Sequence, residues 1–267
     1  MISGLVDGRA ALVSGAASGI GRASARLLAE HGARVALVDL NGAGAEEAAA
    51  QIRQVGGQAI ALQGDAADEA DVARVVSSAA EAVGGLNILV NNAGMAGGER
   101  ASVDELSLER WDEMMRVNFR GYLLMARAAL PWLARDRGVV VNNASSVAIS
   151  SAPGSAHYTT AKAAVVMLTR QMAAEWGPRG VRVNSVAPGI INTGFGRPAD
   201  RRDVVDDALL ARHERYIPLR REGTAEDVAK VILFLCSDLA SYVTGQNLLI
   251  DGGLLQMVYP MVNDTAG

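Results

Sequence analysis

The feature that most constrains the fold is a regular alternation of short apolar segments with longer helical ones. Apolar runs occupy residues 10–14, 34–39, 58–63, 87–91, 139–143, 181–186 and 247–250. Helical patterns occupy residues 19–31, 41–55, 68–83, 107–134, 156–176 and 224–237. Strands that alternate with helices in this way predict a parallel sheet with helices on both faces. Because such crossovers are right-handed, we expect an α/β fold, a Rossmann-type, doubly wound, seven-stranded parallel sheet.

The chain is expected to form a single domain over residues 1–267, because no shift in composition marks a boundary. One irregular stretch, at about 192–221, is rich in charge, Gly and Pro and is predicted to be a lid over the substrate. The formal net charge of −4 argues against nucleic acid as a partner. A polar N-terminus and the lack of an apolar run of about 20 residues predict a cytoplasmic protein that does not insert into a membrane.

The sequence Ser-Gly-Ala-Ala-Ser-Gly-Ile-Gly stands at positions 14–21, directly after the first predicted strand. Its G-x-x-x-G-x-G spacing differs from the commoner G-x-G-x-x-G dinucleotide fingerprint, but the physical reason for the glycines is the same. They let the backbone turn tightly and approach a pyrophosphate at the positive end of the next helix. An ordinary turn is the alternative. The position between a strand and a helix favours a dinucleotide site.

Asp39 closes the second predicted strand. A carboxylate there accepts hydrogen bonds from both hydroxyls of an adenosine ribose and repels a 2′-phosphate. No Arg or Lys stands between Gly15 and Gly21, and Leu40 follows Asp39 where an NADP-binding protein often carries a basic residue. The sequence therefore predicts NAD as the cofactor, against the alternative of a surface aspartate at a strand end.

Two further segments follow predicted strands. Asp65 comes after the third and is placed either to meet the adenine amine or to cap the next helix. Asn91-Asn92-Ala93-Gly94 ends the fourth. Small and amide residues there suit a backbone packed against a cofactor, although similar sequences also form plain turns.

Tyr158 and Lys162 are four residues apart in a predicted helix and so share one face. A phenol has a pKa of about 10, too high for proton transfer at neutral pH. An adjacent ammonium lowers that pKa, and a positive nicotinamide ring adds to the effect. Ser145, at the end of the fifth strand, is placed to hold a carbonyl or alcohol oxygen opposite Tyr158. Asn118 lies within the helix predicted at 107–134, where a buried amide needs partners, and a water between it and Lys162 would form a proton relay.

In their order and spacing these motifs resemble the short-chain dehydrogenase/reductase family, across essentially the whole chain. The motifs are Gly15-x-x-x-Gly19-x-Gly21, Asn91-Asn92-Ala93-Gly94, Asn118, Ser145, Tyr158-x-x-x-Lys162, and Pro188-Gly189 with Thr193 beyond. The resemblance implies that Tyr158 is the general acid/base and Ser145 anchors the substrate oxygen. It implies that Lys162 binds the nicotinamide ribose and tunes Tyr158, while Asn118 holds the relay water. Ile191 and Thr193 are implied at the nicotinamide carboxamide.

The residues expected to contact NAD are Ser14, Gly15, Ser18, Gly19, Ile20, Gly21, Asp39, Leu40, Asp65, Ala66, Asn91, Ala93, Gly94, Tyr158, Lys162, Pro188, Gly189, Ile191 and Thr193. The residues expected to contact the substrate are Met95, Ser145, Ile149 and Tyr158. Further candidates for the pocket are Ala96, Ala148, Ala152, Phe195 and Tyr216. These side chains are largely apolar, so we expect an uncharged, fairly hydrophobic substrate. No metal is expected to take part.

Two positions depart from the family pattern. Ser14 stands where the family usually carries Thr, which keeps the hydroxyl. Ser146 follows Ser145, so either hydroxyl is a candidate. A gapless match from Gly138 to Tyr158 favours Ser145.

Three functions remain open from the sequence. The first is an NAD-dependent oxidoreductase that interconverts a secondary alcohol and a ketone. The second is a 3-oxoacyl thioester reductase that uses NADPH, which Asp39 disfavours. The third is a non-catalytic, cofactor-binding scaffold protein on the same fold, which the complete set of catalytic motifs disfavours.

The chain is also expected to form a homotetramer. Consecutive apolar residues occur in two predicted helices, at 123–125 and 165–168, and they cannot all face one sheet. The apolar tail at 254–262 has no sheet left to cover. Paired helices and exchanged tails would bury these surfaces in two kinds of two-fold contact.

Overall fold

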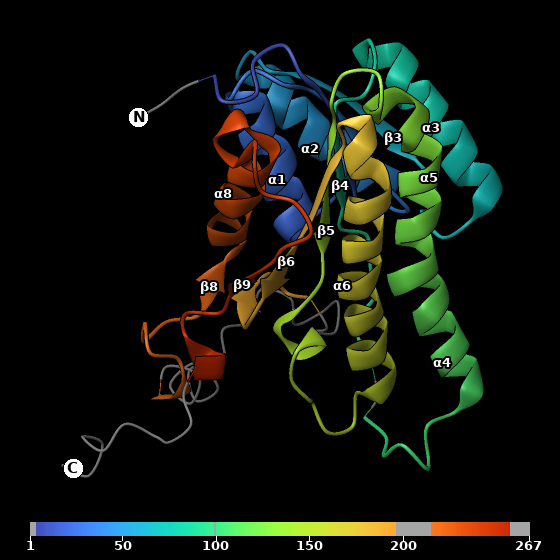
Figure 1. The fold of residues 1–267 in the computed structure, drawn as a ribbon, viewed down its shortest axis with the longest axis vertical. Coiled ribbons are helices and arrows are strands. Elements are labelled where there is room, and N and C mark those ends of the chain that lie inside the picture. The colour runs from blue at the N-terminus through green and yellow to red at the C-terminus, as the bar shows by residue number, and fades with distance from the viewer. Residues whose placement is uncertain (1–3, 99, 196–214, 257–267) are drawn as a thin grey trace.

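A computed structural model describes residues 4–98, 100–195 and 215–256 (Figure 1). Its centre is a seven-stranded sheet in the order β3-β2-β1-β4-β5-β6-β9. Every pair in this sheet is parallel. The strands are β1 (Ala10–Ser14), β2 (Arg34–Asp39), β3 (Gln58–Gln63), β4 (Ile88–Asn91), β5 (Val139–Asn143), β6 (Arg182–Pro188) and β9 (Asn247–Ile250). The predicted doubly wound α/β sheet is confirmed.

Two layers of helices cover the sheet (Figure 1). One face packs against α1 (Gly19–Glu30), α2 (Gly42–Gln54) and α8 (Ala225–Cys236). The other packs against α3 (Glu69–Val83), α5 (Gly121–Leu133) and α6 (Ala156–Trp176). Strand residues alternate between the two cores: Ala11 and Val13 belong to the first, and Ala10 and Leu12 to the second. This period of two follows from the pleat of a strand buried on both faces.

The helix predicted over residues 107–134 is interrupted. It consists of α4 (Leu108–Met115), a π-helical turn at Arg116–Arg120, and α5. The Asn118 side chain in the wide turn bonds both the N–H and the C=O of Met95, each over 2.8 Å. Expecting one continuous helix was therefore wrong. The apolar spacing does not reveal a π-turn, which tertiary contacts stabilise.

The helix ends agree closely with their sequence signals. Thr224 and Asp227 form the predicted capping box of α8. The Ser107 hydroxyl accepts from the Arg110 N–H at the start of α4. Two short strands were not predicted, β7 (Ile191–Asn192) and β8 (Gly223–Thr224), which pair in parallel.

This pair brings together the two ends of the predicted lid. Most of that segment, residues 196–214, lies outside the described residues, as does the part of the predicted apolar tail at 257–262.

The turn between β1 and α1 depends on a glycine with no room for a side chain. A Cβ at Gly21 would overlap the carbonyl oxygen of Gly15 and lie 2.6 Å from the Asn92 amide nitrogen. Gly21→Ala is therefore expected to lower the free energy of unfolding by about 1–3 kcal/mol, as overpacking does elsewhere. Urea denaturation measures the loss.

Gly177→Ala is the matched control. Gly177 has a helical φ of −52°, and a Cβ there would meet nothing within 4 Å. If both variants unfold at the same urea concentration, the turn is not under the steric constraint described here.

Candidate active site

A pocket of about 650 Å³ opens at the carboxyl ends of the strands. The crevice between β1 and β4, where the strand order reverses, is where open α/β sheets bind ligands. Its walls are formed by Gly15, Ser18, Gly19, Ile20, Asp39, Asn92, Gly94, Met95, Ala96, Asn143, Ala144, Ser145, Tyr158, Lys162, Pro188, Gly189, Ile190, Ile191, Thr193, Gly194 and Phe195. The glycine turn, Asp39, Ser145, Tyr158, Lys162 and the segment from Pro188 to Thr193 therefore meet in one pocket.

The glycine turn has the geometry of a phosphate-binding site. Gly15 and Gly19 have φ of +64° and +55°, a region that favours glycine. The turn leads into the N-terminus of α1, where backbone N–H groups and the helix dipole favour an anion. The Ser14 hydroxyl accepts from the N–H groups of Asn92 and Ala93 over 3.0 and 3.1 Å. It therefore ties the turn to the end of β4.

Asp39 lies at the end of β2 on the pocket wall. Its Oδ2 accepts from the Ala17 N–H and its Oδ1 from the Asn41 N–H, both over 2.9 Å. Each carboxylate oxygen can accept a second bond. The nearest basic side chain along α1, Arg22, forms an ion pair with Glu47. The backbone thus fixes a negative charge in the pocket. Leu40 is 69% exposed and does not line it.

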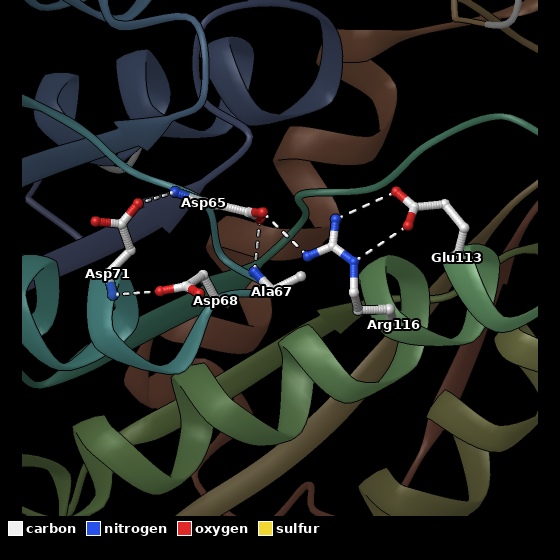
Figure 2. A network of polar contacts seen from close by, with 6 residues as sticks. All are labelled: Asp65, Ala67, Asp68, Asp71, Glu113 and Arg116. Atoms are coloured by element: carbon white, nitrogen blue, oxygen red, sulfur yellow. Dashed lines mark hydrogen bonds and ion pairs between the residues drawn. The ribbon is translucent and has the colours of Figure 1, made fainter.

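Asp65 belongs to a polar network beside the pocket rather than to its wall (Figure 2). Its carboxylate accepts from the Ala67 N–H over 2.8 Å and from Arg116 Nη1 over 3.0 Å. Arg116 also forms an ion pair with Glu113. The helix cap considered for Asp65 is supplied by Asp68, whose Oδ1 accepts from the Asp71 N–H.

The network joins the loop after β3 to the π-turn. The two carboxylates raise the pKa of Arg116, whose charge therefore persists at all working pH values. Ala66 lies next to Asp65 and is also absent from the pocket wall.

Of the two asparagines at the end of β4, the predicted cofactor residue Asn91 does not line the pocket. Asn91 is fully buried, and its Nδ2 donates to the Tyr122 carbonyl and to Asn142 Oδ1. Asn92 lines the pocket instead, and its Nδ2 donates to the carbonyls of Ser14 and Gly15. The sequence offered a way to choose between them, because consecutive side chains along a strand point to opposite faces of the sheet.

Asn143 was missed as a pocket residue. Its Nδ2 donates to Asn92 Oδ1 over 2.8 Å, so one chain of amides links the glycine turn to the end of β5. Its Oδ1 is buried without a hydrogen-bond partner among the described residues.

Ser145 and Tyr158 face the same pocket. Burial raises the pKa of Tyr158, and the neighbouring Ser145 hydroxyl acts in the opposite direction. The expected fall of this pKa is therefore not produced by the protein alone. Ser146 is buried and absent from the pocket wall, so the geometry favours Ser145 of the two candidate hydroxyls.

Lys162 is a buried cation, with only 4% of its surface exposed. Its Nζ donates to the Asn143 carbonyl over 2.8 Å and to the Tyr122 hydroxyl over 3.1 Å. The same nitrogen lies 5.8 Å from the centre of the Tyr158 ring. Burial lowers the pKa of Lys162 to about 7, because water no longer solvates the ammonium. Burial therefore works against the ammonium form of Lys162.

The Asn118 side chain is hydrogen-bonded to Met95 and Met114, and its part in a water relay to Lys162 stays a prediction. Its Oδ1 accepts from the Met95 N–H, while its Nδ2 donates to the Met95 carbonyl and to Met114 Sδ. These bonds fix the loop after β4. The amide thus braces one wall of the pocket.

The candidate substrate residues divide into two groups. Met95, Ala96 and Phe195 line the pocket. Ala148, Ile149, Ala152 and Tyr216 do not, and Ile149 is 55% exposed. Ile149 directly follows a short 3-10 turn after β5.

Two kinds of feature are absent from residues 4–98, 100–195 and 215–256. No group of three or more His, Cys, Asp or Glu side chains there is arranged to hold a metal ion. Within the same ranges, no helix is both long and apolar enough to cross a bilayer.

The chain is similar to known proteins over nearly its whole length. A family model described as enoyl-(acyl carrier protein) reductase matches residues 15–255. The 2-(S)-hydroxypropyl-CoM dehydrogenase 3 of Xanthobacter autotrophicus is 41% identical, over 91% of this chain and 94% of its own. A protein of the same organism named inactive 2-(S)-hydroxypropyl-CoM dehydrogenase 2 is 44% identical, over 86% and 98%.

A solved structure from Sinorhizobium meliloti, a putative short-chain alcohol dehydrogenase, superimposes with a TM-score of 0.87. It is 36% identical, over 95% of this chain and 98% of its own. With the fold and the pocket described above, these matches place the chain in the short-chain dehydrogenase/reductase family of oxidoreductases.

Proposed function

We propose that this protein is an NAD-dependent oxidoreductase that interconverts a secondary alcohol and a ketone. The observation that carries the proposal is that Asp39, the glycine turn, Ser145, Tyr158 and Lys162 line one pocket. The pocket has the parts that a dinucleotide needs. They are a positive helix N-terminus for the pyrophosphate, a carboxylate for the adenosine ribose and a buried lysine for the second ribose.

Bound NAD would accept or return the hydride. The residues proposed to hold it are those of the glycine turn, with Ser14 bracing the turn, Asp39, and the segment from Pro188 to Thr193. Asn92 and Asn143 are added from the structure. The residues that are not retained, because they do not line the pocket, are Leu40, Asp65, Ala66, Asn91 and Ala93.

Tyr158 is proposed as the group that takes the alcohol proton or returns it to the ketone. Ser145 would orient the same oxygen, since both side chains face the pocket. Because burial raises the pKa of Tyr158, its ionisation depends on positive charge nearby. Lys162 supplies such a charge, and an oxidised nicotinamide ring would add a second.

The walls of the pocket favour an uncharged, fairly hydrophobic substrate. Met95, Ala96, Ile190 and Phe195 present mostly apolar surface there. The lid proposed for residues 192–221 would cover this side of the pocket within a single domain.

Asp39→Ala tests the cofactor assignment. Loss of hydrogen bonds to a charged acceptor is expected to weaken NAD binding about 10- to 100-fold and to narrow the preference for NAD over NADP. Calorimetric titration with each cofactor measures both effects. Asp104→Ala, a change in an exposed loop, is the control. Equal use of NAD and NADP by the unaltered protein would contradict the role given to Asp39, and would favour the 3-oxoacyl thioester reductase.

Tyr158→Phe tests the chemistry. Removing the titrating hydroxyl is expected to lower kcat by about 10²–10⁴-fold, while the Kd for NAD changes by less than about threefold. NADH absorbance with a panel of secondary alcohols measures turnover.

Tyr242→Phe removes a hydroxyl from a fully exposed position and should leave turnover unchanged. If Tyr158→Phe retains more than about a tenth of the turnover rate, Tyr158 is not the general acid/base. Absence of turnover in the unaltered protein, with NAD still bound, would support the non-catalytic scaffold.

The homotetramer is also proposed, because apolar side chains remain on helix surfaces away from the sheet. On α6, Val165 and Val166 are buried while the adjacent Met167 is 58% exposed. Multi-angle light scattering at micromolar concentration is expected to give four times the monomer mass. A particle of monomer mass contradicts the proposed homotetramer. A particle of dimer mass shows that only one of the two predicted two-fold contacts forms.

A further inference from the structure

Tyr122 is a buried residue that the sequence analysis did not single out. It lies in the first turn of α5, with 2% of its surface exposed. Its hydroxyl donates to the Asn143 carbonyl over 2.9 Å and accepts from Lys162 Nζ over 3.1 Å. Lys162 Nζ donates to the same carbonyl over 2.8 Å. Three polar atoms from α5, α6 and β5 therefore form a closed triangle beneath the pocket.

The sheet and helix α6 together fix Tyr122. Its own carbonyl accepts from Asn91 Nδ2 over 3.1 Å, and that amide also donates to Asn142 Oδ1 over 3.0 Å. Asn142 Nδ2 donates in turn to the Thr169 hydroxyl, which lies on α6, the helix that carries Lys162. All three of these polar side chains are fully buried. The position of the Tyr122 ring is therefore set by the core.

This placement has two consequences for Lys162. The Tyr122 hydroxyl and the Asn143 carbonyl hold the ammonium of Lys162, a side chain that otherwise has many rotamers. They accept two of the three ammonium protons and leave the third for the pocket. They also favour the charged lysine, as does the Tyr122 ring, whose centre lies 5.0 Å from Nζ. Burial raises the pKa of Tyr122, so its phenol stays neutral and does not compete with Tyr158 for protons.

We propose that Tyr122 is a positioning residue, whose hydroxyl and the Asn143 carbonyl together hold the Lys162 ammonium beside Tyr158. The inference rests on the proposed function, because it assigns Lys162 the task of lowering the pKa of Tyr158.

Tyr122→Phe tests the proposal, since it deletes the hydroxyl and keeps the ring. A displaced or discharged Lys162 no longer favours the Tyr158 phenolate, so the pKa of Tyr158 rises. In alcohol oxidation, the acid limb of kcat/KM against pH should move up by about one unit. The variant would then be about tenfold slower below the limb and nearly equal to the unaltered protein above it. Among the described residues, Lys162 Nζ bonds the Tyr122 hydroxyl and lies 5.8 Å from the centre of the Tyr158 ring.

A purely structural role gives a different result. A partly misfolded variant loses the same fraction of activity at every pH, and its melting temperature falls. Tyr242→Phe, which deletes an exposed hydroxyl, is the matched control. An unshifted acid limb in a folded Tyr122→Phe variant overturns the proposal. If the unaltered protein turns over no alcohol, that result contradicts the proposed function and not the role of Tyr122.

NAD affinity provides a second measurement that does not depend on turnover. Tyr122→Phe should raise the Kd for NAD several-fold, because Lys162 is proposed to bind the nicotinamide ribose. In a Lys162→Met background the same substitution should leave the Kd unchanged, since the ammonium that Tyr122 holds is gone. Equal effects in both backgrounds would show that Tyr122 acts independently of Lys162 and would overturn the proposal.

Discussion

The parallel direction of the sheet is the constraint on which the site depends. Because all seven strands run the same way, their carboxyl ends meet at one edge. The ends of β1, β2, β4, β5 and β6 contribute residues to the pocket or to the loops that line it. Residues far apart in the sequence, such as Asp39 and Pro188, reach the same cavity. An antiparallel sheet would divide these ends between opposite edges.

A buried polar layer lies between this sheet and helices α5 and α6. Asn91, Asn142, Thr169, Tyr122 and Lys162 are nearly or fully buried, and hydrogen bonds connect them. An isolated buried charge is strongly unfavourable. The low pKa of Lys162, about 7, reflects that cost. The acceptors around Nζ offset part of it, so the layer favours the charged lysine in a place where water does not solvate it.

Sequence patterns predicted the fold and the pocket's main residues because both depend on local signals. The periods of strand and helix placed Tyr158 and Lys162 on one face, and the glycine spacing located the turn after β1. Three features were not predicted from the sequence. The apolar pattern did not distinguish the π-turn at Arg116–Arg120 from an α-helix. The choice of Asn92 over Asn91 required the face of β4 to be assigned. The pairing of Tyr122 with Lys162 spans 40 residues and has no short-range signature.

The two sides of the pocket differ in how they are held. On one side, amides connect Gly15, Asn92 and Asn143, and Asn118 clamps both backbone groups of Met95. That wall is fixed by the same hydrogen bonds that fix the strand ends. The opposite wall, from Ile190 to Phe195, continues directly into residues 196–214. Groups held by the first wall keep their positions whichever side chains the second wall presents. On the proposed function, one set of reacting groups can therefore serve different alcohols when the residues from Ile190 to Phe195 change, which fits a fold whose functions vary through its loops.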